Sequence, residues 1–367
     1  MLRVKSDEAG IKAAAEAIKN GKIAAIPTET VFGLAADAFN AEAVRAVYAT
    51  KGRPGDNPLI LHVADKEKIT EIAESLPDYA RKLMDAFWLG PLTLVVRKKP
   101  GLPGWLGGFP DNTVDTVGVR MPSHPVMLAV IKASGCVIAA PSANKAGRPS
   151  PTRTSHVLTD YENTSPAPDI VMEAELSEVG IESTVVDVTG NVPVILRPGA
   201  VTAEILEKTV GKVNQTPDAT KNGAPRAPGM KYRHYAPAAP MTLLSGNAEA
   251  IASYITTQIV SDVNVFIGAL VTPDVRERID RKWNVMAIQG DSDSVYTPLV
   301  SIRTIGKTDD MPGIARDLYD HFRTFDELGV DVILTEALPT EGMGAAIMDR
   351  MTKAAEGRVL RLGAVPQ

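Results

Sequence analysis

The sequence predicts two α/β domains joined by a proline-rich linker. The length of 367 residues is too great for one small domain and suits two. Short apolar runs alternate with helical patterns in both halves of the chain. Between Gly211 and Pro240 stand five prolines and no apolar run long enough for a strand or a helix. We therefore expect a first domain over residues 1–210, a linker over 211–240 and a smaller second domain over 241–367.

Composition and charge exclude several classes of protein. Hydrophobic residues make up 44% of the chain and charged residues 23%, which excludes a disordered, collagen-like or coiled-coil protein. The net charge of −5 provides no global basic field, so any nucleic-acid contact would have to be local. No apolar run approaches the roughly 18 residues that span a bilayer, and the charged start of the chain lacks a signal core. We expect a cytoplasmic protein without a membrane segment.

Cysteine and histidine usage argues against disulfides and zinc. The single cysteine, Cys136, cannot form an intramolecular disulfide. Its apolar surroundings in Cys136–Ala140 favour a buried, inert thiol. The five histidines are scattered, and neither Cys-x-x-Cys nor His-Glu-x-x-His occurs, so a dedicated zinc site is not expected.

The first domain opens with a helix that leads into a strand. Asp7 is a suitable N-cap and Gly21 a suitable residue just past the helix end, and a β-type run follows at 22–26. Further strands are expected at 59–63, 92–96, 116–119, 137–140, 170–172, 184–188 and 193–196. Further helices are expected at about 41–50, 66–88, 123–134 and 202–209. Because several strands follow one another without a helix between them, the sheet should be mixed.

The second domain alternates strands and helices regularly. Strands are expected at 241–244, 263–270, 284–288 and 330–335. Helices are expected at 247–260, 273–280, 312–328 and 344–355. This alternation is typical of a small, doubly wound parallel sheet of the Rossmann-like type.

Polar residues follow several of the predicted strands, where open α/β sheets hold ligands. Two threonines and a glutamate stand in Pro27–Leu34, directly after a strand. Arg120 and Arg197 each end an apolar strand and precede a turn that contains proline. Lys51 and Arg53 lie in a loop fixed by glycine and proline. Since arginine binds phosphate bidentately, the three arginines suggest an anion pocket.

Each of these features also has a purely structural interpretation. Lys51 and Arg53 could end a helix, since cations at a helix C-terminus are favoured by about 0.3–1 kcal/mol. Arg120 and Arg197 could be surface residues whose stems pack on apolar neighbours. In the strand at 59–63, Leu59, Leu61 and Val63 share one face, and His62 lies on the other. A lone histidine is more often structural than catalytic.

Two short motifs suggest other chemistries. Ser142–Lys145 matches the Ser-x-x-Lys pattern of serine acyl-enzymes, but the supporting elements and a secretion signal are missing. The same residues could form a plain polar turn, or a turn that offers donors to a ligand. Ser301–Thr308 nearly spells a phosphate-binding loop, with Ser301 in place of the first glycine and no clear helix following at once. Neither motif establishes a function by itself.

Seven longer motifs occur in a fixed order through the first domain. They are Pro27–Leu34, Lys51–Pro54, Asn57–Leu59 with His62–Val63, Val119–Pro122, Pro141–Asn144, Glu182–Asp187 and Leu196–Gly199. Together they resemble the YrdC-like domain of threonylcarbamoyl-adenylate synthases. The linker end Lys231–Pro237, followed by a small α/β domain, is similar to the two-domain form of that family. The resemblance covers nearly the whole chain and implies a YrdC-like α/β domain with a twisted mixed sheet over residues 1–210.

The resemblance also implies a reaction and a set of site residues. L-threonine, bicarbonate and ATP would give threonylcarbamoyl-AMP and pyrophosphate, and a separate transferase complex would move the threonylcarbamoyl group to the adenosine beside the anticodon of ANN-decoding tRNAs. By motif match, L-threonine would be bound by Thr30, His62, Arg120 and Ser183. ATP would be bound by Lys51, Arg53, Asn57, Thr116, Ala140, Ser142, Asn144, Arg197 and Tyr235. Phe32 stands where family members usually have tyrosine, so a hydrogen bond from a phenol is lost there.

The residue types suit this chemistry. The threonine amine must be neutral to attack a carbonate carbon, and the carbamate oxygen then attacks the α-phosphate as pyrophosphate leaves in line. Arginine and lysine would stabilise the shifting phosphate charge. Mg²⁺ is expected to bridge phosphate oxygens of ATP rather than to occupy a dedicated protein site, since no carboxylate pair offers a cage. Carbamates lose CO₂ in water, so the linker is expected to close over the site as a lid.

Two rival functions remain at this point. The first is an RNA-binding role, or at least weak RNA contact, because YrdC-like domains can present a cationic concave surface. The net charge of −5 argues against this role. A carbamoyltransferase resembling the hydrogenase-maturation proteins is the other. Those proteins also carry cysteine-rich zinc segments, which a single cysteine excludes. The oligomeric state and the role of the second domain are not predicted.

Overall fold

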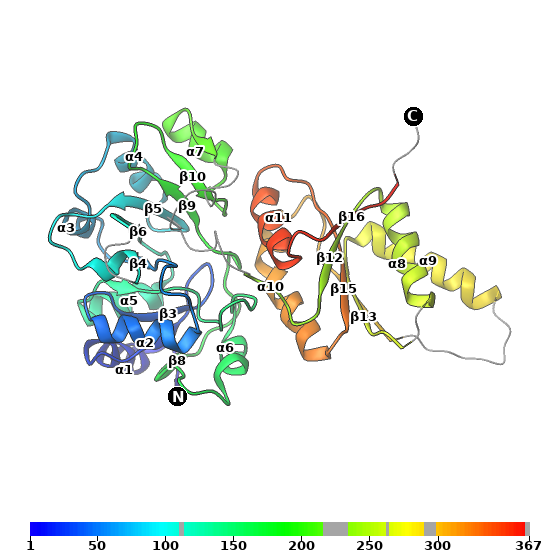
Figure 1. Ribbon diagram of the computed structural model, residues 1–367, viewed down its shortest axis with the longest axis horizontal. Helices are drawn as coiled ribbons and strands as arrows, with labels where there is room; N and C mark the ends of the chain where they lie inside the picture. The colour runs from blue at the N-terminus through cyan, green and yellow to red at the C-terminus, as the bar shows by residue number, and fades with distance from the viewer. Residues whose placement is uncertain (110–113, 216–233, 262–263, 290–298, 364–367) are drawn as a thin grey trace. The chain divides into compact units, whose positions relative to one another are not determined.

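The computed structural model describes residues 1–109, 114–215, 234–261, 264–289 and 299–363. The chain divides into two compact units, coloured from blue to green and from green to red in Figure 1. The first unit comprises Met1–Ala146 and Ser150–Tyr232, and the second comprises Gly147–Pro149 and Arg233–Gln367. Residues 216–233, which hold most of the predicted linker and the Lys231–Arg233 part of its motif, lie outside the described residues. The predicted domain limits therefore stay a prediction.

The first unit is built on a mixed sheet of 11 strands, which confirms the predicted sheet type. Its strand order is β1-β8-β2-β3-β7-β4-β6-β5-β9-β10-β11. The strands are β1 (Leu2–Val4), β2 (Ala24–Ile26), β3 (Gly33–Asp37), β4 (Ile60–His62), β5 (Leu92–Arg97), β6 (Thr116–Arg120), β7 (Ile138–Ala139), β8 (Ile170–Met172), β9 (Thr184–Asp187), β10 (Val194–Arg197) and β11 (Asn214–Gln215). Strand β4 runs parallel to β6 and antiparallel to β7, and β5 runs antiparallel to β6 and parallel to β9.

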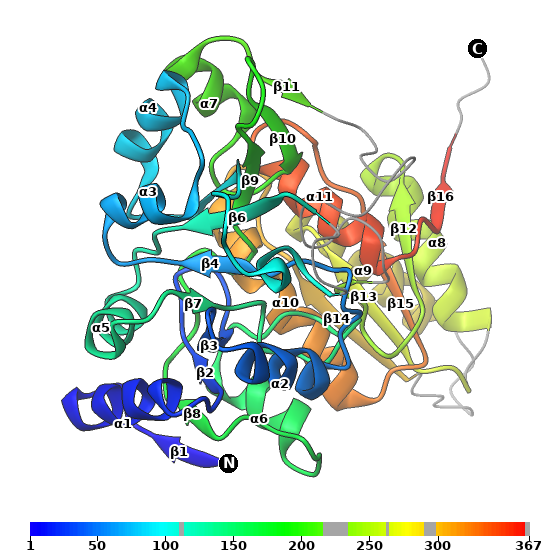
Figure 2. The same cartoon turned by 60° about the vertical axis from the view of Figure 1, so that its left-hand side comes forward.

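Helices cover both faces of this sheet (Figure 2). They are α1 (Glu8–Lys19), α2 (Ala41–Lys51), α3 (Ile69–Ile72), α4 (Asp78–Phe87), α5 (Pro125–Ser134), α6 (Thr154–Tyr161) and α7 (Ala203–Val210), with 3-10 turns η1 (Lys66–Lys68) and η2 (Gly104–Gly107). Ala24 and Ile26 pack with α1 and α5 on one face. Ala25 points to the other face, whose core also contains residues of α2, α4 and α7. This division follows from the alternation of side chains along a strand.

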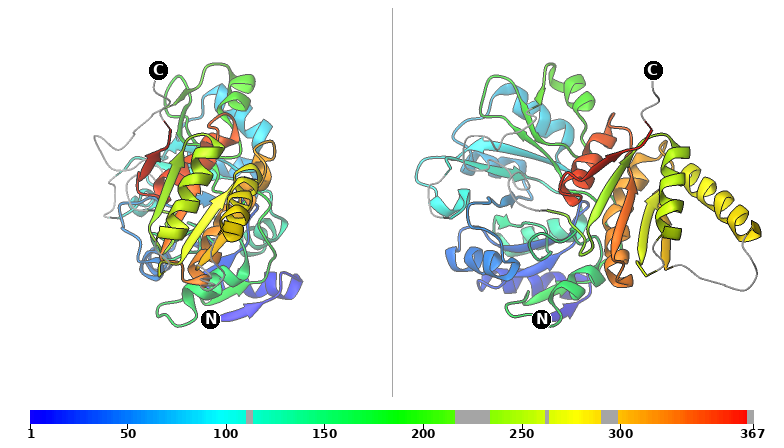
Figure 3. Two further views of the ribbon diagram at one scale, coloured as in Figure 1. Left: turned by 90° about the vertical axis from the view of Figure 1, so that its right-hand side faces the viewer. Right: turned by 45° about the vertical axis from the view of Figure 1, so that its right-hand side comes forward.

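The second unit contains a parallel sheet of five strands in the order β14-β13-β15-β12-β16, as the alternating pattern predicted (Figure 3). The strands are β12 (Met241–Ser245), β13 (Ile267–Val271), β14 (Val300–Thr304), β15 (Val332–Glu336) and β16 (Val359–Arg361). The helices are α8 (Ala248–Ser261), α9 (Pro273–Gln289), α10 (Met311–Leu328) and α11 (Met343–Ala354). Helices α8 and α9 cover one face of this sheet. On α10, Phe325 lies against Gly268 of β13, where a larger residue would collide with its ring.

Local signals placed some boundaries well. Asp7 caps α1, and its carboxylate accepts a hydrogen bond from the Gly10 N–H at 2.9 Å. Gly21 follows the helix with a φ of +74°, the left-handed conformation in which glycine is favoured. The sequence did not predict β1, β3, α6, β11, β14 or β16. Strand β3 was missed because Gly33–Asp37 is rich in alanine and lacks β-branched residues.

Two predicted elements are wrong. The single helix over 66–88 is broken into η1, α3 and α4, because Pro77 lacks an N–H and stands just before α4 as its N-cap. The strand predicted over 284–288 belongs instead to α9, since no glycine or proline interrupts the chain between Pro273 and Gln289.

The strand beside β13 is β14, which covers the first part of the near-phosphate-loop motif. That part is therefore extended strand, and the phosphate-loop interpretation is excluded.

Candidate active site

The loop between β2 and β3 is held by one threonine. Thr28 Oγ1 donates to the carbonyl of Val31 at 2.6 Å and accepts from the N–H groups of Thr30 and Val31, both at 3.2 Å. Such side-chain to backbone bonds build a tight turn without regular secondary structure. The turn fixes the backbone of Glu29 and Thr30, which are both 2% exposed.

Arg120 lies at the centre of a buried polar cluster. It ends β6, and in register it pairs with His62 on β4 and with Thr93 on β5. Its Nη1 donates to Thr30 Oγ1 at 2.9 Å, and its Nη2 lies 2.5 Å from Glu29 Oε1 in an ion pair. The side chains of Arg120 and Glu29 are 4% and 3% exposed. Glu29, Thr30, His62 and Arg120, called the Arg120 cluster below, therefore converge inside the first unit.

Charge and burial fix the protonation states in this cluster. Burial raises the pKa of Glu29, but the Arg120 charge and the N–H of Ser123 lower it further, so its pKa lies below the ordinary value. Burial, followed by the Arg120 charge, lowers the pKa of His62 to about 3. Glu29 is consequently a carboxylate and His62 a neutral imidazole at neutral pH.

Ser183 joins the cluster through Thr93. Ser183 Oγ lies 2.8 Å from Thr93 Oγ1, and Thr93 is the strand neighbour of Arg120. Arg197 also reaches Ser183, with Nε and Nη2 donating to its carbonyl at 3.1 and 2.9 Å and Nη2 to its hydroxyl at 3.2 Å. By these contacts Arg197, which was predicted to bind ATP, lies beside a residue that was predicted to bind threonine.

A second polar centre forms where α2 ends. Lys51 Nζ donates to the carbonyl of Ser142, to the carbonyl of Asn144 at 2.6 Å and to Asn144 Oδ1 at 3.4 Å. Ser142 Oγ lies 2.5 Å from Asn144 Oδ1. Lys145 instead donates to the Thr50 carbonyl at 2.8 Å. No serine–lysine pair therefore forms among these described residues, which excludes the acyl-enzyme interpretation.

The remaining predicted ATP residues of the first unit lie at one end of the central strands β4, β6 and β7. Arg53 donates to Asn57 Oδ1 at 2.7 Å and to the carbonyls of Asn57 and Pro58 at 3.0 and 2.9 Å. Thr116 begins β6, which runs parallel to β4, so it lies at the same end of these strands as Asn57, which precedes β4. Ala140 follows β7 and donates its N–H to the Ile60 carbonyl at 3.0 Å. His62 and Arg120 end β4 and β6, so the topology separates them from these ATP residues, whereas Arg197 of the ATP set lies with the threonine set beside Ser183.

The segment that contains Phe32 joins the two sets. Phe32 is completely buried, its N–H donates to the Pro151 carbonyl at 2.8 Å and its carbonyl accepts from Ala143 at 2.7 Å. Gly33 forms a bridge with Ser142. The turn that holds Ser142 and Asn144 is thus bonded directly to the segment that follows Thr30.

Tyr235 is described with the second unit. It is 5% exposed and has a φ of +65°, a conformation that side-chain-bearing residues rarely adopt. Its ring lies 5.7 Å from that of Tyr319, and the Arg350 guanidinium lies 5.8 Å from it. Its predicted role toward ATP stays a prediction.

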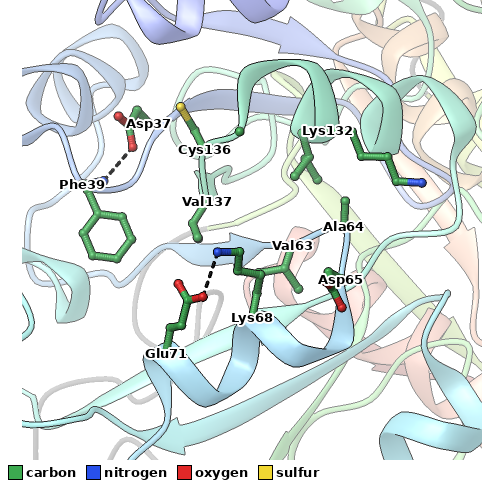
Figure 4. Close-up of a pocket in the computed structure, with 12 residues that line it drawn as sticks. Asp37, Phe39, Val63, Ala64, Asp65, Lys68, Glu71, Lys132, Cys136 and Val137 are labelled. Carbon is green, nitrogen blue, oxygen red and sulfur yellow. Dashed lines mark hydrogen bonds and ion pairs between the residues drawn. The ribbon is translucent and has the colours of Figure 1, made fainter.

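A separate pocket of about 570 Å³ lies beside the ends of β3 and β4 (Figure 4). None of the predicted site residues lines it. Cys136 does, with its sulfur directed toward Asp37. The predicted burial of Cys136 is wrong, because it lies in the turn between Gly135 and the central strand β7 and is only half-buried. Burial, followed by the Asp37 charge, raises the thiol pKa, so the thiol is protonated at neutral pH.

Sequence reasoning gave no role to two residues of the Arg120 cluster region. Glu29 was visible as a carboxylate in a strand-end motif, which is the signal that could have identified it. Thr93 stands inside the apolar run Leu92–Val96 and carries no such signal.

Within the described ranges, no helix is long and apolar enough to cross a membrane. Nor do the residues with described positions include a group of three or more His, Cys, Asp or Glu side chains that could hold a metal ion.

The first unit is thus an α/β domain with two buried polar centres, both candidate ligand-binding centres, on one mixed sheet. Family models match both halves of the chain: one described as "Telomere recombination" matches residues 16–199, and one described as "Threonylcarbamoyl-AMP synthase, C-terminal domain" matches residues 201–356. The chain is 38% identical over 352 residues to the threonylcarbamoyl-AMP synthase of Bacillus subtilis, covering 96% of this chain and 94% of the relative. It is 37% identical over 363 residues to that of Pyrococcus abyssi, covering 98% of each.

A solved structure agrees. The crystal structure of P. abyssi Sua5 complexed with L-threonine is similar with a TM-score of 0.84 at 36% identity, over 99% of this chain and 98% of that one. The chain belongs to the threonylcarbamoyl-AMP synthase family and is a nucleotidyltransferase. This confirms the expected family and excludes RNA binding and hydrogenase maturation as descriptions of its main activity.

Proposed function

We propose that this chain forms threonylcarbamoyl-AMP and pyrophosphate from L-threonine, bicarbonate and ATP. The observation that carries the proposal is the Arg120 cluster, a buried set of charged and hydroxyl groups, in a chain that matches threonylcarbamoyl-AMP synthases over nearly its full length. The product would serve threonylcarbamoyl-adenosine modification beside the anticodon of ANN-decoding tRNAs. A separate transferase complex would take it up.

The two polar centres would divide the substrates. Thr30, His62, Arg120 and Ser183 would bind L-threonine, with the guanidinium facing its carboxylate. Lys51, Arg53, Asn57, Thr116, Ala140, Ser142, Asn144 and Arg197 would bind ATP. The contact between Arg197 and Ser183 supports placing Arg197 where the two substrates meet, beside the carbamate and the α-phosphate. His62, neutral at physiological pH, would accept or donate a hydrogen bond without adding a second cation next to Arg120.

The chemistry of the site would proceed in two steps. The neutral threonine amine attacks the bicarbonate carbon to give the carbamate, with loss of water. The carbamate oxygen then attacks the α-phosphate, and pyrophosphate leaves in line. Arg197 and Arg53 are the cations that would stabilise negative charge on the phosphates during this displacement.

Mg²⁺ is proposed to enter with ATP. Glu29, the acidic residue of the Arg120 cluster, is paired with Arg120, and the groups around the predicted ATP residues are mainly amide, hydroxyl and cationic. Such a set fits a metal held mostly by phosphate oxygens and water. Bound there, Mg²⁺ would neutralise phosphate charge, while the side chains named above orient the nucleotide.

The linker is proposed to act as a lid, with Tyr235 contributing to ATP binding. Carbamates lose CO₂ in water, so the reaction needs exclusion of solvent. Replacing Tyr235 with Ala should raise the KM for ATP and lower the rate, measured in the full chain. The same proposal assigns residues 1–210 to catalysis, 211–240 to the lid and 241–367 to a Rossmann-like domain. The enzyme is expected to work in the cytoplasm, with at most weak RNA contact.

The direct test is pyrophosphate release from ATP, Mg²⁺ and bicarbonate. Release should depend on L-threonine, should be much slower with L-serine and should be absent without an amino acid. Mass spectrometry should find a nucleotide heavier than AMP by the threonylcarbamoyl group. Folded protein that releases no pyrophosphate with threonine would contradict the proposal.

A further inference from the structure

The pocket beside the ends of β3 and β4 has no part in the proposed function. Ligand pockets typically measure about 300–1,000 Å³, and this one measures about 570 Å³. All of its lining residues belong to the first unit. They come from the ends of β3 and β4, from η1 and α3, and from the end of α5 and the turn before β7 (Figure 4). The pocket is therefore a candidate ligand site of its own, and its lining indicates which ligand fits.

Much of this lining is apolar. Val63, Ile131 and Val137 contribute aliphatic side chains. Phe39 also lines the pocket and is 43% exposed, so a phenyl ring stands there only partly covered by the protein. A ligand that filled the pocket would remove this apolar surface from water, which favours a ligand with an apolar body.

The side of the pocket that holds Cys136 and Asp37 is negatively charged. Asp37 Oδ1 accepts the Phe39 N–H at 3.0 Å, and Asp37 forms no ion pair with a residue that the structure describes. Because a carboxylate can accept several hydrogen bonds, Asp37 keeps capacity for a further donor. Helix α5 ends at Ser134, whose carbonyl accepts the Cys136 thiol at 3.6 Å. The negative end of the α5 dipole therefore lies on this side too.

The remaining charges of the lining balance one another. Lys68 Nζ pairs with Glu71 Oε1 at 2.8 Å. Lys132 extends away from Asp37, toward the side of the pocket where Asp65 caps η1 (Figure 4). The charge left without a counterpart is that of Asp37, and the ligand group that complements it is a cation.

We propose that this pocket binds a small organic amine, with its ammonium group at Asp37 and its apolar body against Phe39 and Val63. The site is separate from the two proposed substrate centres, but its backbone is bonded to one of them. Val63 directly follows His62, and its N–H donates to the Arg120 carbonyl at 3.0 Å. A bound amine should therefore alter the use of threonine. That effect rests on the proposed function, whereas the amine site itself does not.

Alkylation of Cys136 by iodoacetamide tests the site. Cys136 is the one cysteine of the chain and lines the pocket, so the intact mass of the full chain reports on this place alone. The probes are 2-phenylethylamine, its uncharged counterpart 2-phenylethanol and its anionic counterpart 3-phenylpropanoate. Hydrogen bonds to charged groups are worth about tenfold to a hundredfold in affinity. The amine should therefore slow alkylation at a concentration at least about tenfold lower than the alcohol, and the anion should protect least.

Two matched variants locate the charge that selects the amine. Asp37→Asn keeps an acceptor for the Phe39 N–H but removes the charge, so the preference for the amine over the alcohol should collapse. Asp65→Asn alters the acid on the other side of the same pocket and should keep the preference. Each variant is compared with its own rate without probe, because the Asp37 charge also affects the thiol.

The link to the threonine centre is measured by pyrophosphate release. Coupling between two sites is typically worth about fivefold or more. Saturating 2-phenylethylamine should change the threonine KM of the unaltered chain by about that factor, and the change should be absent in Asp37→Asn.

Other outcomes would overturn the inference. Alkylation that no concentration of the amine slows would exclude the site. Equal protection by amine and alcohol would mean that the pocket selects no cation, and that comparison needs no variant. A preference that survived in Asp37→Asn, or was lost in Asp65→Asn, would contradict the role of Asp37. Protection with an unchanged threonine KM would exclude the link to the threonine centre. A folded chain that made no threonylcarbamoyl-AMP would contradict the proposed function and leave the alkylation result standing.

Discussion

Two buried cations in the first unit are used in opposite ways. Arg120 forms an ion pair with the buried Glu29 carboxylate through Nη2, and its Nε has no hydrogen-bond partner in the part of the chain that the structure describes. Lys51, which is 2% exposed, donates to two backbone carbonyls and a side-chain amide of the Ser142–Asn144 turn. The first arrangement is suited to receive an external charge, whereas the second holds two pieces of chain together. Burial of a cation alone therefore does not distinguish the two arrangements, and Lys51 would bind ATP by exchanging one of these hydrogen bonds.

The contrast gives the two centres different expected energetics. Removing one member of a buried ion pair leaves the other charge uncompensated, whereas removing a lysine from carbonyl oxygens leaves neutral acceptors. The three predictions below probe that difference, beginning with the largest effect.

Arg120→Ala should destabilise the protein by about 3–5 kcal/mol, because Glu29 would stay buried without a countercharge. Urea unfolding measures this. Arg45→Ala is a matched control, since the Arg45–Glu42 pair has side chains that are 53% and 84% exposed, and exposed pairs contribute less than about 1 kcal/mol. Equal losses in the two variants would show that burial of the Arg120 pair carries no special cost.

Lys51→Met should cost about 1.5–3 kcal/mol, the range for hydrogen bonds that involve a charged group. Because Lys51 holds the Ser142–Asn144 turn, amide hydrogen exchange should accelerate at Ala143, whose N–H bonds to Phe32. The KM for ATP should rise, while the affinity for threonine should change little. A rise in the threonine KM alone would reverse the assignment of the two centres.

His62→Gln should flatten the dependence of stability on pH. The folded-state pKa of about 3 lies below the unfolded value of 6.5, so the unfolded chain binds a proton first as the pH falls. This histidine therefore lowers stability progressively below pH 6.5, by about 2 kcal/mol at pH 5 relative to pH 7. Urea unfolding of the variant should lack that part of the loss. An unchanged slope would mean that His62 titrates normally in the folded protein.

The comparison also shows what the sequence could predict. The mixed and parallel sheets followed from how helices and strands alternate, and Asp7 and Gly21 marked the ends of α1 because caps have strong local preferences. The helix break at Pro77 was readable but overlooked, and α9 was cut short although no breaker interrupts it.

The site was harder to predict because it depends on long-range contacts. Motifs identified the residues, but no local pattern says that Thr93 connects Arg120 to Ser183, or that Arg197 contacts Ser183. These contacts depend on the order of the strands in the sheet, which brings distant parts of the sequence together. Likewise, the sequence shows Glu29 as a carboxylate in a turn, whereas its burial and its ion pair with Arg120 appear only in three dimensions.

The central claim is that one chain binds threonine and ATP at two distinct centres of the first unit, and the most direct test is a kinetic matrix. Pyrophosphate release is measured over a grid of threonine and ATP concentrations for the unaltered chain, His62→Ala and Arg53→Ala. The account predicts that His62→Ala mainly raises the KM for threonine, and that Arg53→Ala abolishes the use of ATP at any threonine concentration. Equal effects of both substitutions on both substrates would contradict it.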